Sequence, residues 1–337
     1  MTDTALVTGS AGFIGFHTAE RLLQSGARVI GLDAMTDYYD PDLKEARHAI
    51  LAQSPEFIPV KARLEDAGVM AGLMAKFKPQ TVVHLAAQAG VRYSIDAPRS
   101  YVEANLIGTY EVLEAARANP PAHLMLASTS SVYGANTTMP YAETDKADSQ
   151  MSFYAATKKA TEAMAHSYAH LYGIPITMFR FFTVYGPWYR PDMALFKFVK
   201  AIEAGKPIDV YNHGDMRRDF TYVDDLVEGL MRLRGAVPGT EPVGENDSLS
   251  PAAPFRIVNI GNSRPTRLMD FIKAIEGALG REAVLNMMDM QPGDVPATWA
   301  DASLLTALVG ELPCTPLEDG VRRFVDWYRS YYDRGGM

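Results

Sequence analysis

The chain has 337 residues, of which 47% are hydrophobic and 21% are charged, a composition typical of a globular protein with one large domain or two medium ones. Its formal net charge is −8 at pH 7, and this diffuse acidic balance argues against a nucleic-acid partner, because phosphate contacts need clustered Lys and Arg. No apolar run reaches the length of a membrane span, and the first residues lack the features of a signal peptide. Because the single cysteine, Cys314, excludes an intramolecular disulfide, we expect a cytoplasmic protein without a membrane partner.

Strand-like and helical segments alternate along the first half of the chain. Residues 5–9 predict a buried strand, residues 16–26 a helix that ends at a glycine, and residues 28–33 the next strand. Further strands are predicted at 57–64, 81–87, 123–129 and 176–182, and a long helix at 101–117. This alternation predicts an α/β fold with a doubly wound parallel sheet that is covered by helices on both faces.

The alternation becomes less regular after about residue 183. Residues 236–255 are rich in Pro, Gly, Ser and acidic residues, which predicts an exposed, mobile loop. The other predicted elements are a helix at 192–205, a strand at 256–261 and helices at 267–280 and 320–332. The last of these helices carries four aromatic residues at helical spacing, which favours core packing over a ligand site.

A glycine-rich turn, GSAGFIG, joins the first strand to the first helix. Gly9, Gly12 and Gly15 would let the backbone approach a pyrophosphate, and the start of the helix would supply free N–H groups. Asp33, at the end of the second strand, is placed to accept hydrogen bonds from an adenosine ribose and to repel a 2′-phosphate. Residues 34–40 contain no Arg or Lys, so the sequence favours NAD over NADP. The alternative reading is a common glycine turn followed by a solvated aspartate.

The stretch SFYAATKKA places Tyr154 four residues before Lys158, and therefore on one face of a helix. A free phenol has a pKa of about 10, too high for a base at neutral pH. A nearby ammonium would lower the pKa of Tyr154. Such a tyrosine can take a proton from a sugar hydroxyl while a hydride leaves the same carbon. Taken alone, such a pair is usually a coincidence of the protein surface, and it becomes the leading candidate because it follows the glycine-rich turn.

The motifs GSAGFIG, TSSVYG, YAATK, FFTVYGPW and RRDFTYVDD resemble the extended short-chain dehydrogenase/reductase family over nearly the whole chain. Four longer stretches are most similar to the UDP-glucuronate 4-epimerases of that family: DAMTDYYDPDLKEAR, QAGVRYS, FFTVYGPWYRPDMALFKF and MQPGDVPATWAD. The resemblance implies a Rossmann domain that binds NAD, and an NAD that is reduced and reoxidised within one turnover. It also implies a smaller, partly interleaved C-terminal α/β domain that binds a UDP-sugar.

We place the expected NAD-binding domain at 1–182, with returning segments near 214–235 and 255–262, and the UDP-sugar domain at 183–213 and 263–332. The resemblance also implies a homodimer built through a four-helix bundle by the helices at 101–117 and 153–173. No metal is expected, because His166 and His170 share a helix face but lack a nearby third ligand.

By motif position, the resemblance makes Tyr154 the catalytic base, has Lys158 bind the nicotinamide ribose, and has Thr129 hydrogen-bond the 4-hydroxyl of the sugar. Asn105 resembles the asparagine that kinks a helix in this family. One departure concerns the adenine contact, because Arg63 stands where the family has an aspartate and Asp66 lies further along. The expected cofactor-binding residues are Gly9, Gly12, Phe13, Ile14, Gly15, Asp33, Leu64, Leu85, Ala86, Ala87, Tyr154 and Lys158.

The segment 129–134 separates the reactions that the family carries out. Oxidising C4 of a UDP-hexuronic acid gives a ketone β to the carboxylate, which readily loses carbon dioxide. Decarboxylases of the family have a glutamate in this segment, and 4,6-dehydratases have an Asp-Glu pair, whereas this chain has only hydroxyls there. We therefore expect Ser130, Ser131, Thr183 and Arg190 to hold the carboxylate and suppress its loss. The alternative for Arg190 is a solvated loop arginine.

The resemblance also supplies a nucleotide site. Arg218 would bind the diphosphate, Asp294 the ribose, and Tyr211 would line the uracil pocket, while Arg92 would approach the substrate. The expected reaction is the reversible interconversion of UDP-glucuronate and UDP-galacturonate through a 4-keto intermediate. Three alternatives stay open: an epimerase of a neutral UDP-hexose, a UDP-glucuronate decarboxylase, and an NAD-sensing scaffold without catalysis.

Overall fold

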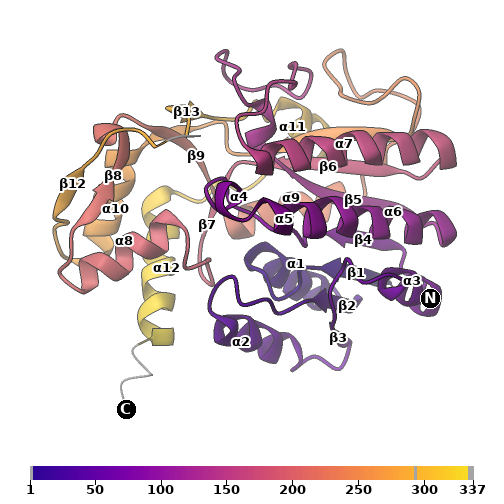
Figure 1. The fold of residues 1–337 in the computed structure, drawn as a ribbon, viewed down its shortest axis with the longest axis horizontal. Helices are drawn as coiled ribbons and strands as arrows, with labels where there is room; N and C mark the ends of the chain where they lie inside the picture. Colours follow the sequence, from indigo (N-terminus) through magenta and orange to yellow (C-terminus); the bar gives the residue numbers. More distant parts are fainter. Residues whose placement is uncertain (1–2, 292–293, 333–337) are drawn as a thin grey trace.

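The computed structural model describes residues 3–291 and 294–332. Its largest sheet has seven parallel strands in the spatial order β3-β2-β1-β4-β5-β6-β10 (Figure 1). The strands are β1 (Thr4–Thr8), β2 (Arg28–Asp33), β3 (Phe57–Lys61), β4 (Thr81–His84), β5 (His123–Thr129), β6 (Ile176–Phe181) and β10 (Phe255–Ile260). The strand order reverses between β1 and β4, which confirms the predicted doubly wound sheet and places a ligand crevice at that point.

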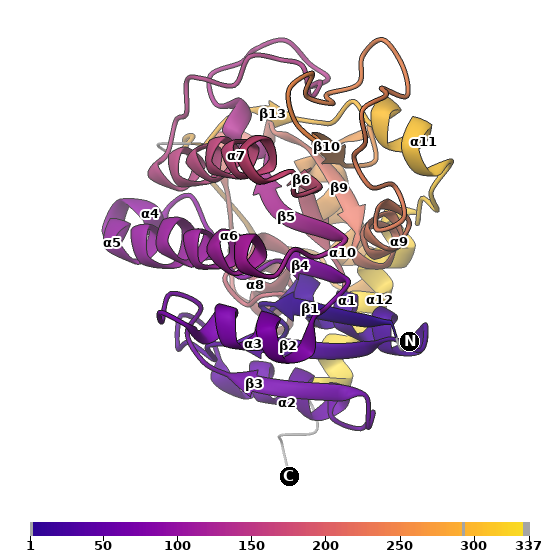
Figure 2. The same cartoon turned by 90° about the vertical axis from the view of Figure 1, so that its right-hand side faces the viewer.

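Helices cover both faces of this sheet (Figure 2). One face packs against α1 (Phe13–Gln24) and α9 (Val223–Leu233), and the other against α3 (Val69–Phe77), α6 (Gly108–Ala118) and α7 (Phe153–Tyr172). A further helix, α2 (Pro41–Leu51), packs beside α1. Alternate residues of β1 enter the two cores, Ala5 and Val7 one and Leu6 the other, and all three are fully buried. This double burial explains why β1 reads as a continuous apolar run.

The predicted helix at 101–117 is interrupted near its start. It comprises α5 (Pro98–Tyr101), a π-helical turn η1 (Val102–Ile107) and α6, and the short helix α4 (Tyr93–Asp96) precedes it. Asn105, in the π turn, accepts a hydrogen bond from the Gln88 backbone N–H at 2.8 Å and donates to Thr157 Oγ1 at 3.0 Å. The asparagine therefore links the kinked helix to the loop after β4 and to α7, and π turns of this kind are frequent at functional sites.

A second unit lies beside the carboxyl ends of the large sheet, at the left of Figure 1. Its main sheet pairs β9 (Arg217–Tyr222) with β7 (Thr183–Tyr185), β11 (Pro265–Arg267) and β13 (Ala297–Thr298), while β8 (Ile208–Val210) pairs with β12 (Leu285–Met287). The helices around these strands are α8 (Ala194–Glu203), α10 (Leu268–Leu279) and α12 (Leu317–Tyr332), whereas α11 (Ser303–Val309) packs on α9 and β10. The chain passes between the two units, since α9 packs on α1 and β10 joins the large sheet.

The segment 236–255 differs from its prediction. Residues 239–246 are exposed, as expected, but the following residues are anchored to the fold. Asp247 forms an ion pair with Arg256 in which both side chains are buried, and Ser250 hydrogen-bonds His166 at 2.8 Å. The prediction of exposure is therefore wrong for Asp247, because composition alone does not reveal a buried partner.

None of the described helices is long and apolar enough to cross a bilayer. Of the four aromatic residues at helical spacing in α12, Phe324 enters the core as predicted, and Trp327 and Tyr328 pack against it partly buried. Phe324 is fully buried and packs against the rings of Phe196 and Trp327.

Candidate functional site

The glycine turn after β1 forms a backbone cradle. Gly9 has a φ of +74°, and a Cβ at that position would lie only 2.8 Å from the backbone nitrogen of Ala86. A Cβ on Gly15 would lie 1.9 Å from the carbonyl oxygen of Gly9, so only glycine fits there. No side chain caps the start of α1, where Gly12 is the N-cap residue. Its first backbone N–H groups therefore have the arrangement that binds a phosphate.

A cavity of about 490 Å³ extends from this cradle along the carboxyl ends of β1, β2, β4 and β5. Its size lies within the usual range for a small-molecule or cofactor site. Asp33 accepts hydrogen bonds from the Ala11 and Met35 backbone N–H groups at 2.9 and 2.8 Å, which leaves further lone pairs of its carboxylate for a ligand. Every expected cofactor-binding residue lines this cavity: Gly9, Gly12, Phe13, Ile14, Gly15, Asp33, Leu64, Leu85, Ala86, Ala87, Tyr154 and Lys158.

Two charged residues at this cavity were not expected from the sequence. Lys44, on the first turns of α2, lines the cavity near Asp33 and donates hydrogen bonds to the backbone carbonyl and hydroxyl of Thr36 at 2.5 and 3.0 Å. Glu65 lines it beside Leu64 and accepts a hydrogen bond from Arg63 Nε at 2.8 Å. Asp66, further along the chain from the missing family aspartate, does not line the cavity, and the carboxylate in this segment that does so belongs to Glu65.

Tyr154 and Thr129 are brought together where α7 begins. The hydroxyl of Ser152 accepts a hydrogen bond from the Ala155 backbone N–H at 3.1 Å, which caps α7 and sets Tyr154 in its first turn. Burial raises the pKa of the Tyr154 phenol, while a hydrogen bond with Thr129 and the charge of Arg190 act in the opposite direction. The helix N-terminus also favours the phenolate.

Lys158 is held against the end of β5. Its Nζ donates to the Ala127 carbonyl oxygen at 2.9 Å, and it is not among the groups that shift the pKa of Tyr154. The expectation that Lys158 and an oxidised nicotinamide ring together bring this phenol near neutrality stays a prediction, because burial of the ring outweighs the protein charges around it. Burial also lowers the pKa of Lys158 to about 8, and Glu162 opposes this shift.

A smaller cavity of about 240 Å³ adjoins the first one and shares Thr129 and Ser131 with it. It lies between the 3-10 turn η2 (Ser130–Tyr133), β7 and the sheet around β9. Among the described residues that line it, Asp294 is the one carboxylic acid. The hydroxyls expected to hold a carboxylate, those of Ser130, Ser131 and Thr183, all line this cavity.

Arg190 lies on the cofactor side and not in the smaller cavity. Its Nε and Nη2 donate to the carboxylate of Asp192 at 3.0 and 2.6 Å, and the guanidinium lies 5.7 Å from the centre of the Tyr38 ring. This ion pair occupies one edge of the planar guanidinium and leaves the Nη1 side for a second anion. The structure thus brings together the three hydroxyls, with Arg190 on the adjoining wall.

The residues expected at the nucleotide form two groups. Arg218 and Asp294 line the smaller cavity, and burial lowers the pKa of Arg218, so that an anion beside this guanidinium would be favoured. Arg92 and Tyr211 line neither cavity. Arg92 instead pairs with Asp294 at 3.0 Å and lies 4.6 Å from the centre of the Tyr211 ring, and so links the loop after β4 to the turn η3 (Tyr211–Gly214).

No group of three or more His, Cys, Asp or Glu side chains within residues 3–291 and 294–332 is arranged to hold a metal ion. His166 and His170 instead hydrogen-bond the anchored loop, His166 through Ser250 and His170 through the Ala252 carbonyl oxygen at 2.7 Å.

Comparisons with known proteins agree with this geometry. Residues 5–242 match the model of the NAD dependent epimerase/dehydratase family. The chain is 56% identical to a probable UDP-glucuronate 4-epimerase of Rhizobium meliloti (strain 1021), with 98% of each chain covered. It is 46% identical to UDP-glucuronate 4-epimerase 4 of Arabidopsis thaliana, over 98% of this chain and 76% of that one.

A solved structure shows the same arrangement of the chain. The crystal structure of UDP-glucuronic acid 4-epimerase from Bacillus cereus in complex with UDP-glucuronic acid and NAD has a TM-score of 0.88 and 31% identity to this chain, covering 98% of this chain and 100% of that one. As its sequence motifs predict, the chain belongs to the NAD dependent epimerase/dehydratase family.

Proposed function

We propose that this protein interconverts UDP-glucuronate and UDP-galacturonate by NAD-dependent inversion at C4, with the carboxylate retained. The observation that carries the proposal is the adjacency of a dinucleotide cradle, the Thr129–Tyr154 pair and a cavity with hydroxyls in place of acids at 130 and 131. The similarity to the probable UDP-glucuronate 4-epimerase of Rhizobium meliloti and to UDP-glucuronate 4-epimerase 4 of Arabidopsis thaliana supports the same substrate, as do the ligands of the Bacillus cereus structure.

The residues of the larger cavity fit NAD. The cradle at Gly9 and Gly15 would hold the pyrophosphate against the start of α1, and the free lone pairs of Asp33 would accept the adenosine ribose hydroxyls. Lys158 would bind the nicotinamide ribose. Bound there, NAD supplies the group that takes up a hydride from C4 of the sugar and returns it.

We propose that Tyr154 accepts the proton of the 4-hydroxyl and later returns it. Thr129 hydrogen-bonds the phenol and lines both cavities, so it is placed to hold the same sugar hydroxyl. Because burial raises the pKa of Tyr154, the phenol needs positive charge beside it when the substrate reacts. Arg190 already acts in that direction, and the oxidised cofactor adds to it.

The hydroxyls of Ser130, Ser131 and Thr183 would keep the carboxylate on the sugar. Hydrogen-bond donors stabilise a carboxylate, and loss of carbon dioxide from the 4-keto intermediate would sacrifice those bonds. The Nη1 side of Arg190 offers a further donor on the adjoining wall. These residues act at the reacting end of the substrate, which must reorient between the two hydride transfers.

The UDP end would stay anchored while the sugar turns. Arg218 is the half-buried cation among the described residues of the smaller cavity and suits the diphosphate, and Asp294 suits the ribose. Arg92 contacts both Asp294 and the ring of Tyr211, so it would close over the nucleotide, with Tyr211 beside the uracil. Uniform binding at one end leaves the contacts at the other end free to change during the reaction.

Proton NMR of the products formed from UDP-glucuronate tests the function. We expect UDP-galacturonate to appear and the two uronates to reach equilibrium from either side. A UDP-pentose as the main product would show a decarboxylase, and turnover of UDP-glucose but not of UDP-glucuronate would show a hexose epimerase. No turnover of any UDP-sugar by protein loaded with NAD would favour the scaffold.

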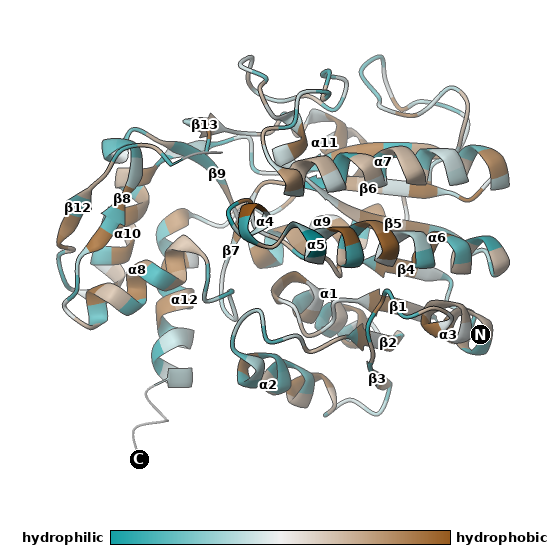
Figure 3. Cartoon of the chain, viewed as in Figure 1, coloured by the Kyte–Doolittle hydropathy of each residue, from teal (hydrophilic) through white to brown (hydrophobic). Residues whose placement is uncertain are grey.

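We also propose that the protein forms a homodimer through a four-helix bundle in the cytoplasm. Figure 3 shows α4, α5, α6 and α7 along one side of the molecule, with hydrophobic residues among them. A large exposed apolar patch marks an interaction surface, since soluble monomers rarely expose large apolar patches. Exposed hydrophobic residues of this surface include Tyr93, Ile95, Val102, Ile107, Tyr110, Phe153, Leu171 and Tyr172.

Sedimentation velocity tests the dimer. We expect the protein to sediment at twice the mass of its chain and Ile107→Arg to sediment as a monomer, because a charge cannot be buried unpaired in an apolar interface. The control is Val284→Arg, an exposed hydrophobic residue just before β12, which should remain dimeric. A wild-type protein that is monomeric at micromolar concentration would contradict the proposal.

A further inference from the structure

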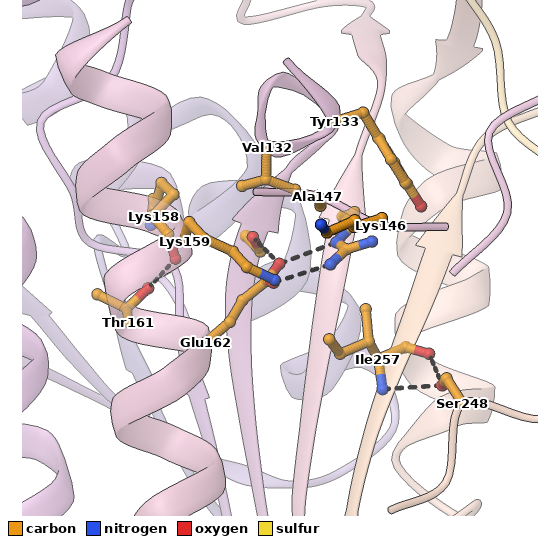
Figure 4. A network of polar contacts seen from close by, with 12 residues as sticks. Val132, Tyr133, Lys146, Ala147, Lys158, Lys159, Thr161, Glu162, Ser248 and Ile257 are labelled. Carbon is orange, nitrogen blue, oxygen red and sulfur yellow. Dashed lines mark hydrogen bonds and ion pairs between the residues drawn. The ribbon is translucent and has the colours of Figure 1, made fainter. Parts of the chain in front are cut away.

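A buried ion pair lies directly behind the proposed catalytic residues, and the chemistry above does not use it. Glu162 follows Lys158 by one turn of α7, and its carboxylate accepts hydrogen bonds from Arg180 Nε and Nη2 of β6 at 2.9 and 2.8 Å (Figure 4). The two side chains are only 2% and 1% exposed. Because desolvation offsets the attraction in such a pair, stability alone is a weak reason for its presence.

The Glu162 carboxylate also connects α7 to the end of β5. The side chains at 154, 158 and 162 repeat every four residues and so share one face of the helix. Each of them binds one of three consecutive residues of β5, which fixes the strand end and the helix in one register. The pairs are Ala127 O with Lys158 Nζ at 2.9 Å, Ser128 Oγ with Glu162 Oε1 at 2.7 Å, and the side chains of Thr129 and Tyr154.

The charges around Lys158 do not balance without Glu162. His84 stays neutral, since burial and the charge of Lys158 lower its pKa to about 3, and Lys159, which also pairs with Glu162 at 3.2 Å, is partly solvated. Glu162 is thus the one carboxylate whose charge acts on Lys158 in the described part of the chain. The other groups that face this site are Tyr154 and Lys159 on α7, His84 on β4 and Arg180 on β6. On its other side, Arg180 faces the ring of Tyr133 and the buried carboxylate of Glu143.

The two buried cations respond differently when that carboxylate is lost. A guanidinium keeps its proton in proteins, whereas a buried ammonium can release its proton. Without the negative charge at 162, Lys158 and Arg180 would be left as like charges in a buried region. Lys158 would then lose its proton at a lower pH, because Arg180 cannot.

We propose that Glu162 is a positioning residue that keeps Lys158 in its ammonium form and holds β5 and α7 in register for Thr129 and Tyr154. The effect of Glu162 on catalysis rests on the proposed function. The coupling between Glu162 and Lys158 does not, because it can be measured in the protein without any substrate.

Two variants of the same ion pair give opposite predictions. Glu162→Gln should lower the pH at which Lys158 loses its proton by about one unit, and Arg180→Met should raise it by a similar amount, because each removes a charge of opposite sign. Both variants lose the same buried pair and are destabilised in the same direction. Opposite shifts therefore cannot come from a loss of stability.

The titration is read in two ways. The side-chain ¹⁵N resonance of Lys158 is followed against pH in lysine-labelled protein and is identified with the variant Lys158→Arg. The second readout is the alkaline limb of kcat/KM for UDP-glucuronate. The ammonium is present below its pKa and lost above it, so this limb should move to lower pH in Glu162→Gln and to higher pH in Arg180→Met.

Asp247→Asn is the matched control, because Asp247 forms the other buried ion pair, with Arg256 of β10, and does not contact Lys158. This variant should lose stability and leave the titration of Lys158 unchanged. Shifts of the same sign in the two test variants, or an unchanged titration in either, would overturn the inference. If Glu162→Gln does not fold, Arg180→Met decides by itself. Opposite NMR shifts in a protein that does not turn over UDP-glucuronate would leave the inference intact and refute the proposed function.

Discussion

Tyr154→Phe is expected to reduce the interconversion of UDP-glucuronate and UDP-galacturonate by about 10³-fold or more. The change removes only the phenol oxygen, which is the proposed proton acceptor, and general base catalysis contributes about 10²–10⁴-fold to enzyme rates. The ring itself would stay in place, since it packs edge-on against Tyr101 with the ring centroids 6.0 Å apart. Turnover is measured by NMR and UDP binding by calorimetry, and UDP binding should persist.

Tyr101→Phe provides the matched control for this variant. Tyr101 is fully buried, and its hydroxyl donates to the Gly90 carbonyl oxygen at 2.5 Å. Losing that bond should cost about 1 kcal/mol of stability and leave most of the turnover. If Tyr154→Phe retained a tenth of the wild-type rate, Tyr154 would not be the base, whatever the behaviour of the control.

Much of the site follows from residues that are local in the sequence. Each of these signals lies within one strand–helix unit: the glycine turn, the acid at the end of β2, and the Tyr154–Lys158 spacing. The alternation of parallel strands and helices places all three at the same edge of the sheet. The structure accordingly places Gly9, Asp33 and Tyr154 along one cavity. The kinked helix at Asn105 was also predicted, through its family motif.

Contacts between distant segments were not predictable in this way. Arg92 pairs with Asp294 across 202 positions of the chain, and no local pattern indicates that partner. The burial that raises the pKa of Tyr154 has the same origin, because i,i+4 spacing specifies a shared helix face but not how deeply that face is buried. The position of Glu65 at the cavity was not predictable either, because this residue lies in an irregular loop and not in a helix or strand.

The partner of Arg190 is a different case. Asp192 lies two residues further along, so the sequence contained the signal that this guanidinium is already paired. The pairing makes the hydroxyls of the smaller cavity more important for the carboxylate than the sequence suggested. The roles of the Thr183 hydroxyl and the Arg190 guanidinium can therefore be tested with separate variants.

Thr183→Val should shift the product of UDP-glucuronate from the epimer towards a UDP-pentose. Valine keeps the shape of threonine but removes the donor, and a hydrogen bond to a charged group contributes about 1.5–3 kcal/mol, so the pentose fraction should rise about tenfold or more. Arg190→Ala should raise it as well and also slow turnover, because Arg190 favours the Tyr154 phenolate. The released carbon dioxide is measured by ¹³C NMR with substrate labelled at C6.

Thr298→Val separates this effect from a general change of the cavity. Thr298 lines the same cavity from β13, on the sheet that would bind the nucleotide, and it should not touch the carboxylate. This variant is expected to change KM more than the product ratio. Should Thr183→Val and Arg190→Ala both form the epimer with no added pentose, the carboxylate is not held by these groups, and its retention must then arise from the orientation of the sugar ring. If Thr298→Val alone released carbon dioxide, the carboxylate would instead point towards β13.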